Sequence, residues 1–249
     1  MAYSDIIKEM ESLKGFKLIN DFKMLEITQK IFTYNYNSLC YSVDRFEQDI
    51  ELCFSINSSK RDEVTFVILR SLHNYLASAF TLVNHTRKLK QKLNNEKVNV
   101  FYDKELEKLK STEVVAFVKD FRNYIQHRSL PICSRSLHFE TIEGTSQCSL
   151  DHKILLNREE LLKWRKGSKS KWTSKSKKYL NRFDSNINIK LFCKEYYDTV
   201  INFDKVFFEM LLKEYETDIK ELKDFQEHIT KLYPPQTKAY EPELKCEDK

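Results

Sequence analysis

The chain has very few of the residues that open tight turns. Its 249 residues include three glycines, Gly15, Gly144 and Gly167, and four prolines. Because glycine and proline punctuate chains that are rich in short loops, their scarcity favours long helices. It also excludes glycine-rich phosphate loops, since neither G-x-x-x-x-G-K nor G-x-G-x-x-G occurs. The sequence therefore argues against enzymes that cradle a nucleotide in such a loop.

Two further absences bear on the compartment and on cofactors. The six cysteines are far apart, and no C-x-x-C pair is present to seed a zinc or redox site. The N-terminal residues lack the apolar run of a signal peptide, and we expect no later segment to be long and apolar enough to span a bilayer. We therefore expect reduced thiols in a cytoplasmic protein, with no metal, no cofactor and no membrane partner.

The net charge of +5 is mild, but the positive charges are unevenly distributed. Residues 164–178, WRKGSKSKWTSKSKK, contain seven Lys or Arg, two Trp and no acid. Tryptophans among lysines offer a stacking surface beside phosphate-pairing charges, a combination that binders of single-stranded RNA use. We expect this basic loop either to bind RNA or to be an ordinary solvated loop. The predicted RNA-binding residues in it are Trp164, Lys169, Lys171, Trp172, Lys175, Lys177 and Lys178.

The strongest predicted helix runs from about residue 61 to 93. Its buried stripe has apolar residues at intervals of three and four, namely Val64, Ile68, Leu72, Leu76, Ala79 and Val83. The opposite face is predicted to be polar from end to end and consists of Arg70, Asn74, Ser78, Thr81, His85 and Lys88. Short hydrogen-bonding side chains occupy the centre of this face, where a solvated face usually carries Glu and Lys. We expect the face to line a cleft or a partner surface.

The rest of the chain is predicted to be mainly α-helical, with one insertion. Core helices are expected over about 20–132 and 188–231, and Pro131 should end one of them just after His127. Alternating residues from Leu137 to Leu156 predict a β-hairpin, after which Asn157 caps a short helix. Residues 1–233 then form a single helical domain, in which the hairpin and the basic loop occupy about 133–183. The polar tail, 234–249, is predicted to be disordered.

One short motif suggests a chemistry directly. Within residues 117–131, FVKDFRNYIQHRSLP, Arg122 and His127 bracket four residues on a predicted helix. Each residue turns a helix by ~100°, so these two side chains lie roughly 140° apart and flank Asn123 and Gln126. They need not meet within one chain. A two-fold axis could nevertheless bring two copies of the pair around one cleft, and self-complementary dimers are the commonest soluble oligomers.

This residue pair suits RNA cleavage without a metal. The reaction removes the 2′-hydroxyl proton, stabilises a phosphorane with extra negative charge, and protonates the leaving 5′-oxygen. Histidine can serve either proton transfer because its unperturbed pKa is near 6.5. The planar donors of Arg122 match phosphate oxygens, and Asn123 could orient either group. Arg122, His127 and Asn123 are thus the predicted catalytic residues, and the predicted RNA path adds Arg70, Asn74, His85, Lys88 and Gln126.

The stretch R-N-Y-I-Q-H resembles the R-x₄₋₆-H motif of the HEPN (higher eukaryotes and prokaryotes nucleotide-binding) family. The preceding RSLHNYLASAFTLVNHTRKL is similar to the long second helix of that family. The resemblance covers about residues 20–132 and a closing helix near 188–231. It implies an all-helical homodimer that cleaves RNA at a composite Arg–His site without a metal. An antitoxin or other defence partner protein is also implied.

Three alternatives remain open at this point. Some HEPN proteins have lost activity, so the chain could be an inactive helical module that binds RNA or protein with the same cleft. A match to R-x₄₋₆-H also arises easily by chance in a sequence with this many arginines and six histidines, which would leave Arg122 and His127 as an incidental surface pair. A DNA-binding regulator has only the basic loop in its favour, because no helix-turn-helix signature accompanies it.

Overall fold

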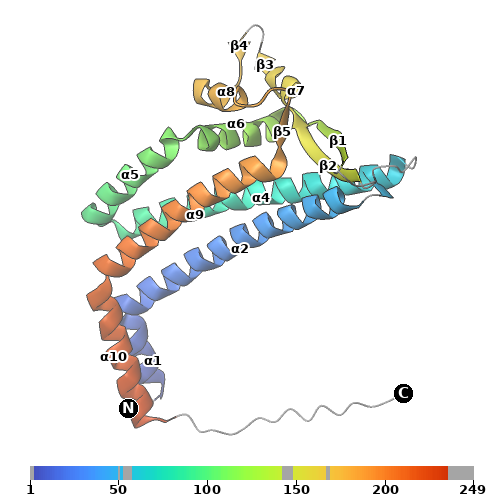
Figure 1. The fold of residues 1–249 in the computed structure, drawn as a ribbon. Helices are drawn as coiled ribbons and strands as arrows, with labels where there is room; N and C mark the ends of the chain where they lie inside the picture. The colour runs from blue at the N-terminus through green and yellow to red at the C-terminus, as the bar shows by residue number, and fades with distance from the viewer. Residues whose placement is uncertain (1–2, 50, 53–57, 142–147, 167–168, 235–249) are drawn as a thin grey trace, which may run out of the picture. The chain divides into compact units, whose positions relative to one another are not determined.

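The computed structural model describes residues 3–49, 51–52, 58–141, 148–166 and 169–234. Most of these residues are helical, which confirms the prediction of a mainly α-helical fold (Figure 1). The chain divides into two compact units, and each is described by itself. The smaller combines residues 1–22 with 215–249, and the larger comprises residues 23–214. The single domain expected over 1–233 stays a prediction, because this division does not show whether either unit folds alone.

The smaller unit is built from helix α1 (Tyr3–Ser12), the beginning of α2 (Lys14–Gln48) and α10 (Glu216–Leu232). Gly15 lets α2 and α10 approach closely, because a Cβ atom there would lie 2.2 Å from the Asp218 carbonyl oxygen. The Lys14 ammonium contacts the Asp218 carboxylate at 2.9 Å in the same place. The predicted disordered tail, 234–249, lies outside the described residues except for Pro234.

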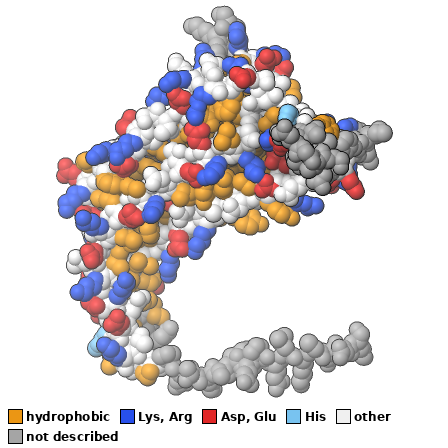
Figure 2. All heavy atoms as spheres, in the orientation of Figure 1, with side chains coloured by type: hydrophobic (Ala, Val, Ile, Leu, Met, Phe, Trp, Pro, Cys, Tyr) orange, Lys and Arg blue, Asp and Glu red, His pale blue; other side chains and the backbone are white. Residues whose placement is uncertain are grey.

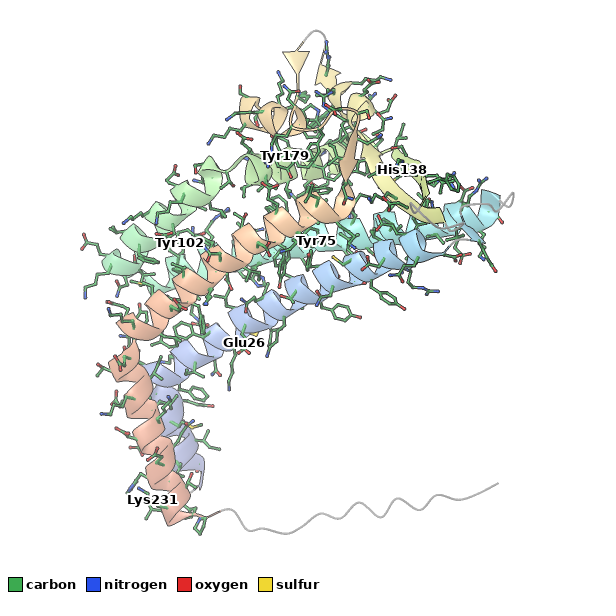
Figure 3. All side chains as sticks on the ribbon, in the orientation of Figure 1. Glu26, Tyr75, Tyr102, His138, Tyr179 and Lys231 are labelled. Carbon is green, nitrogen blue, oxygen red and sulfur yellow. The ribbon has the colours of Figure 1, made fainter. Side chains whose placement is uncertain are left out.

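Three long helices form the centre of the larger unit. These are α2, α4 (Ser58–Leu93) and α9 (Ile189–Glu214), which lie side by side (Figure 1). Tyr75 of α4 lies between the other two and is labelled in Figure 3. Its ring stacks on Phe32 at 5.3 Å, and its hydroxyl donates to the Cys193 carbonyl at 2.8 Å. Aromatic packing of this kind holds the helices together by burying large apolar area.

Helices α5 (Glu96–Ser111) and α6 (Glu113–His127) follow α4. The break between α4 and α5 is encoded by two asparagines: Asn94 adopts a positive φ of 44°, and the Asn95 side chain accepts the Val98 N–H. Thr112 is the N-cap residue of α6, but its hydroxyl donates backward to the Leu109 carbonyl and makes no cap hydrogen bond to the helix. The predicted end of this helix at His127 is confirmed.

The predicted hairpin is confirmed as β1 (Cys133–Thr141) paired antiparallel with β2 (Cys148–Asn157). The residues that join the two strands, 142–147, lie outside the described residues. A third strand, β5 (Asn186–Asn188), pairs with β2 and was not predicted. Between them lie α7 (Arg158–Leu162), the short strands β3 (Arg165–Lys166) and β4 (Lys169–Ser170), and α8 (Ser174–Leu180). The Asn157 side chain caps α7 by accepting the Glu160 N–H, as predicted.

One expectation about membranes needs correction. Within the described residues, the part of α4 from Ser59 to Leu93 is long and apolar enough to cross a bilayer by length and composition. The expectation that no such segment exists is therefore wrong. The same residues supply core side chains of the larger unit, including Ile68, Leu72 and Leu82. A core helix passes the same test, so this finding is weak evidence for a span, and the cytoplasmic location stays a prediction.

Candidate functional site at the α4–α6 groove

Helix α6 holds Arg122 at the edge of a pocket. The helix packs one side into the core through Phe117, Val118 and Phe121, which leaves Arg122 half-buried on the neighbouring side. The Arg122 guanidinium lies over the ring of Phe80 from α4, 4.3 Å from its centroid. This cation–π contact orients the guanidinium without using its hydrogen-bond donors on another side chain. The donors are thereby left to face a ligand.

The pocket beside Arg122 has a volume of about 230 Å³ and lies between α4 and α6. Its polar lining comes from His73, Thr81, Asn84, Arg122 and Gln126. At Thr81 and Asn84 it adjoins a second pocket of about 400 Å³, which His85, Arg87 and Lys88 also line. Neither pocket has an acidic side chain among its described lining residues. Together they form what we call the α4 groove, whose donors and cations suit an anionic ligand.

The α4 groove continues past His73 into a third, mostly apolar pocket of about 450 Å³. Its apolar lining comes from Phe66, Leu69 and Leu130. The charged residues Arg70 and Asp62 also line it. The Arg70 guanidinium lies 5.8 Å from the Phe66 ring. The predicted residue Arg70 therefore lines the pocket that adjoins the pocket of Arg122 at His73, next to apolar surface on which a base could stack.

His127 does not share this pocket with Arg122 in one chain. It is the exposed last residue of α6, and it is not among the residues that line the α4 groove. The half-buried Asn123 is not a lining residue either. This arrangement agrees with the angle expected from helix geometry. A catalytic pair of Arg122 and His127 would therefore need a second copy of the chain.

One histidine that the R-x₄₋₆-H motif does not include lies close to Arg122. His73 of α4 is exposed and lines the same pocket as Arg122. The predicted polar face runs in steps of four, from Arg70 through Asn74 to Ser78, and each such step drifts by about 40° on a 3.6-residue helix. Ser78 is consequently buried and donates to the Tyr75 carbonyl, so the predicted polar face is wrong at that position. Following the exposed positions 66, 70, 73, 77, 81 and 84 would have found His73 and Asn84.

The other residues predicted to contact RNA on α4 and α6 are only partly brought together. Lys88 is exposed and lines the second pocket. His85 also lines it, but its Nδ1 atom is 2.8 Å from the Thr28 hydroxyl of α2, a contact that restrains the ring. Gln126 lines the pocket of Arg122. Asn74 is exposed but lies outside the lining of all three pockets.

Trp172 was predicted to stack on RNA, and the structure contradicts this. The side chain is only 3% exposed, and its indole N–H donates to the Leu161 carbonyl at 2.7 Å. Its ring stacks on Phe117 and Tyr124 of α6, at 5.8 and 5.9 Å. A tryptophan in a basic segment can thus be the anchor that fixes the segment to the core. Trp164 is half-buried and packs edge-on against Trp172 at 5.2 Å.

The lysines of the basic loop also divide into two classes. Lys171 and Lys177 are exposed. Lys178 pairs with Glu113 at 2.6 Å, and the Lys175 ammonium donates to the Lys110 carbonyl at 2.9 Å, so both are engaged by α5 and α6. The side chain of Lys169 lies outside the described residues. Figure 2 shows Lys and Arg interleaved with Asp and Glu on the face in view, in place of one continuous basic patch.

A buried carboxylate holds the insertion against α6. Asp120 is 6% exposed and accepts the Thr173 backbone N–H at 2.8 Å and the Ser176 hydroxyl at 2.6 Å. Both donors come from the first turn of α8, where a negative charge also meets the positive end of the helix dipole. Asp120 lies two residues before Arg122. The basic loop and the Arg122 pocket are therefore attached to the same helix.

Comparison of the chain with protein-family models, with curated proteins and with solved structures found no match. Among the described residues, no group of three or more His, Cys, Asp or Glu side chains is arranged to hold a metal ion. Three of the cysteines, Cys40, Cys133 and Cys193, are described and carry free thiols. The functional argument therefore rests on the residues of the α4 groove.

Proposed function

We propose that the protein is a metal-independent endoribonuclease of the HEPN type. The observation that carries the proposal is the position of Arg122, whose donors face a pocket that has no acidic side chain among its described lining residues and has His73 and Gln126 beside it. An anionic phosphate fits such a lining, because fixed donors and positive charge are worth most in a partly enclosed site. The resemblance of R-N-Y-I-Q-H to the HEPN motif supports the same assignment.

In the proposed reaction, a histidine removes the proton from the RNA 2′-hydroxyl, and the resulting oxygen attacks the adjacent phosphorus. Arg122 stabilises the phosphorane. The bond to the 5′-oxygen then breaks, and a protonated histidine supplies the proton that this oxygen needs, leaving a 2′,3′-cyclic phosphate and a 5′-hydroxyl. His127 from a second copy fills the histidine role in a composite site. His73, which lines the pocket of Arg122 in the same chain, is the rival for it.

A second candidate function is a catalytically inactive module that binds RNA or a protein in the same groove. The observation in its favour is that Arg122 and His127 of one chain do not line a common pocket. A toxin or defence role, with an antitoxin or other partner protein, belongs to the nuclease proposal and would not apply to this module. The two functions separate cleanly by whether RNA is cut.

We expect the purified protein to cleave single-stranded RNA in excess EDTA and to leave 2′,3′-cyclic phosphate ends, because none of the proposed steps uses a metal. DNA of the same sequence should survive, since it lacks the attacking 2′-hydroxyl. Gel electrophoresis and mass spectrometry of the products measure both expectations. Folded protein that binds diverse RNAs without cutting them would replace the nuclease by the binding module.

The basic loop should add affinity for RNA through Lys171 and Lys177, the exposed lysines that have no ion-pair partner among the described residues. We expect Lys171→Ser with Lys177→Ser to flatten the dependence of log K on log salt by about 1.4, since each phosphate contact on a single strand contributes ~0.7. The matched pair, Lys175→Ser with Lys178→Ser, removes the same charge from lysines that are already engaged by Lys110 and Glu113. It should change the slope less. If fluorescence titrations give the same slope of log K against log salt for wild type and for both double variants, the loop is a solvated linker that does not contact RNA.

A further inference from the structure

The exposed side of α2 carries a row of large apolar side chains. Met24, Ile27, Ile31, Tyr34 and Tyr41 are 58%, 48%, 50%, 73% and 64% exposed, and all five lie in the larger unit. A single exposed apolar residue is ordinary, but a continuous row on one helix face marks a surface made for contact. We call this row the α2 seam.

The spacing of the α2 seam follows a seven-residue repeat. Steps of three and four lead from Met24 through Ile27 and Ile31 to Tyr34, and the same steps continue through Ser38 to Tyr41. This is the period with which two helices pack side by side along their length. Phe32 and Leu39 on the other side of α2 are fully buried in the bundle. In Figure 3, side chains project from the edge of α2 that faces away from α4 and α9, and Glu26 is labelled there.

We propose that the α2 seam is the interface between two copies of this chain, with the two α2 helices packed antiparallel. This inference goes beyond the proposed nuclease and does not rest on it. A second copy is the occupant that fits, because the repeat makes the surface complementary to itself. A two-fold axis passing between Ile31 and Tyr34 places each of these residues opposite the other in the second copy.

The size of the seam agrees with this occupant. From their exposed fractions, the five side chains offer roughly 600 Å² per copy, or about 1,200 Å² for the pair, at the lower bound of specific interfaces. An interface at this lower bound is typical of weak or transient complexes, as opposed to obligate ones. The association should therefore depend on protein concentration.

Charges beside the seam select the antiparallel orientation. In a parallel pair, Arg45 would face the Arg45 of the other copy across the seam, and Asp44 would lie beside its Asp49. Both contacts bring like charges together. In the antiparallel pair the two Arg45 side chains move to opposite ends, and Asp44 of one copy comes near Lys23 of the other. Asp44 also pairs with Lys190 of its own chain.

The α2 seam and the pocket of Arg122 lie on different sides of the bundle. Tyr75 of α4 contacts Phe32 of α2, whereas His73, which lines the pocket of Arg122, is roughly 160° around the helix from Tyr75. The second pocket lies nearer to α2, because His85 lines it and contacts Thr28. A seam dimer therefore leaves the pocket of Arg122 open. A composite nuclease site would need a second two-fold contact through α6, and two such contacts give a closed tetramer when their axes cross at right angles.

The first test is the mass of the full chain by sedimentation velocity over about 1–100 μM, the range that an interface of this size predicts. We expect Ile31→Glu to halve the mass of the wild-type assembly at the upper concentrations, whether that assembly is a dimer or a tetramer. The matched control is Val100→Glu, which places the same charge on an apolar side chain of α5 that is 65% exposed and outside the seam. It should leave the mass unchanged. Wild type that is monomeric throughout, or an assembly that Ile31→Glu does not reduce, overturns the seam.

The second test determines the relative orientation of the two α2 helices by disulfide cross-linking. The linked peptides are identified by mass spectrometry. Met24→Cys mixed with Tyr41→Cys should form a disulfide between chains, because the antiparallel pair brings these positions together. Met24→Cys alone should not, since its two copies would be about 25 Å apart. The reverse pattern overturns the antiparallel seam. RNA cleavage by Ile31→Glu reports separately on the nuclease, so failure of one proposal is distinguishable from failure of the other.

Discussion

Arg122→Ala should lower the rate of RNA cleavage by about 10²-fold or more, because loss of one preorganised donor to a developing oxyanion has an effect of that size. The fold should persist, since Arg122 is half-buried and contacts the face of Phe80 without filling the core. Single-turnover cleavage at saturating RNA measures the loss. Arg61→Ala, at the start of α4 and outside the groove, is the matched control and should cut normally.

Mixing inactive variants shows which histidine acts with Arg122. If the site is composite, Arg122→Ala and His127→Ala should each be inactive alone, and their mixture should recover on the order of a quarter of the activity, because mixed dimers contain one intact combination. If His73 acts within the chain, His73→Ala should be the inactive histidine variant, and no mixture should recover activity. His138→Ala, an exposed histidine on β1 that Figure 3 labels, controls for loss of a surface imidazole. Normal cutting by Arg122→Ala would remove the nuclease assignment from this groove.

Trp172→Ala should destabilise the larger unit by about 3–5 kcal/mol, the usual result of deleting a large buried aromatic side chain. The substitution removes the stack on Phe117 and Tyr124 and the hydrogen bond to the Leu161 carbonyl. Urea denaturation followed by circular dichroism gives the free energy of unfolding. Trp164→Ala removes the same residue type from a half-buried position and should have a smaller effect.

RNA binding by a third variant, Trp172→Phe, separates the packing role of Trp172 from a role in RNA recognition. Trp172→Phe keeps an aromatic ring in the core and should bind RNA as wild type does, because the Trp172 ring is covered by its own chain. A folded Trp172→Phe variant with much weaker RNA binding, and an unfolding free energy unchanged by Trp172→Ala, would contradict the packing that we describe.

Local sequence patterns predicted the helical fold and the positions at which several of its elements begin or end. The end of α6 at His127, the cap at Asn157 and the β1–β2 hairpin follow from one or a few neighbouring residues, and all are present. The strand β5 has only three residues and forms by pairing with the edge of β2. Its own sequence is too short to contain a pattern that predicts a strand. The burial of Trp172 likewise depends on a distant helix, whereas its basic neighbours suggested exposure.

The candidate site was predictable to the extent that it lies on a single helix. Arg122 and Gln126 belong to one pocket because they share a face of α6. His73 joins them from α4, and only the packing of the two helices brings it there. A rule based on the spacing R-x₄₋₆-H looks along one helix and cannot find a partner that lies across a groove. The exposed stripe of α4 was the signal that could have found it.

The hydrogen bonds of Asp120 also affect the order in which the chain can fold during its synthesis. Thr173 and Ser176 lie 53 and 56 residues after the carboxylate that they satisfy. During synthesis, α6 therefore emerges from the ribosome with a polar group and an aromatic side that have no cover until the insertion follows. Contacts of such long range form late, since loop closure must precede them. A gene shortened to the helices alone would encode a chain in which Phe117 and Tyr124 lack the Trp172 ring that stacks on them, and aggregation is the expected fate of that chain.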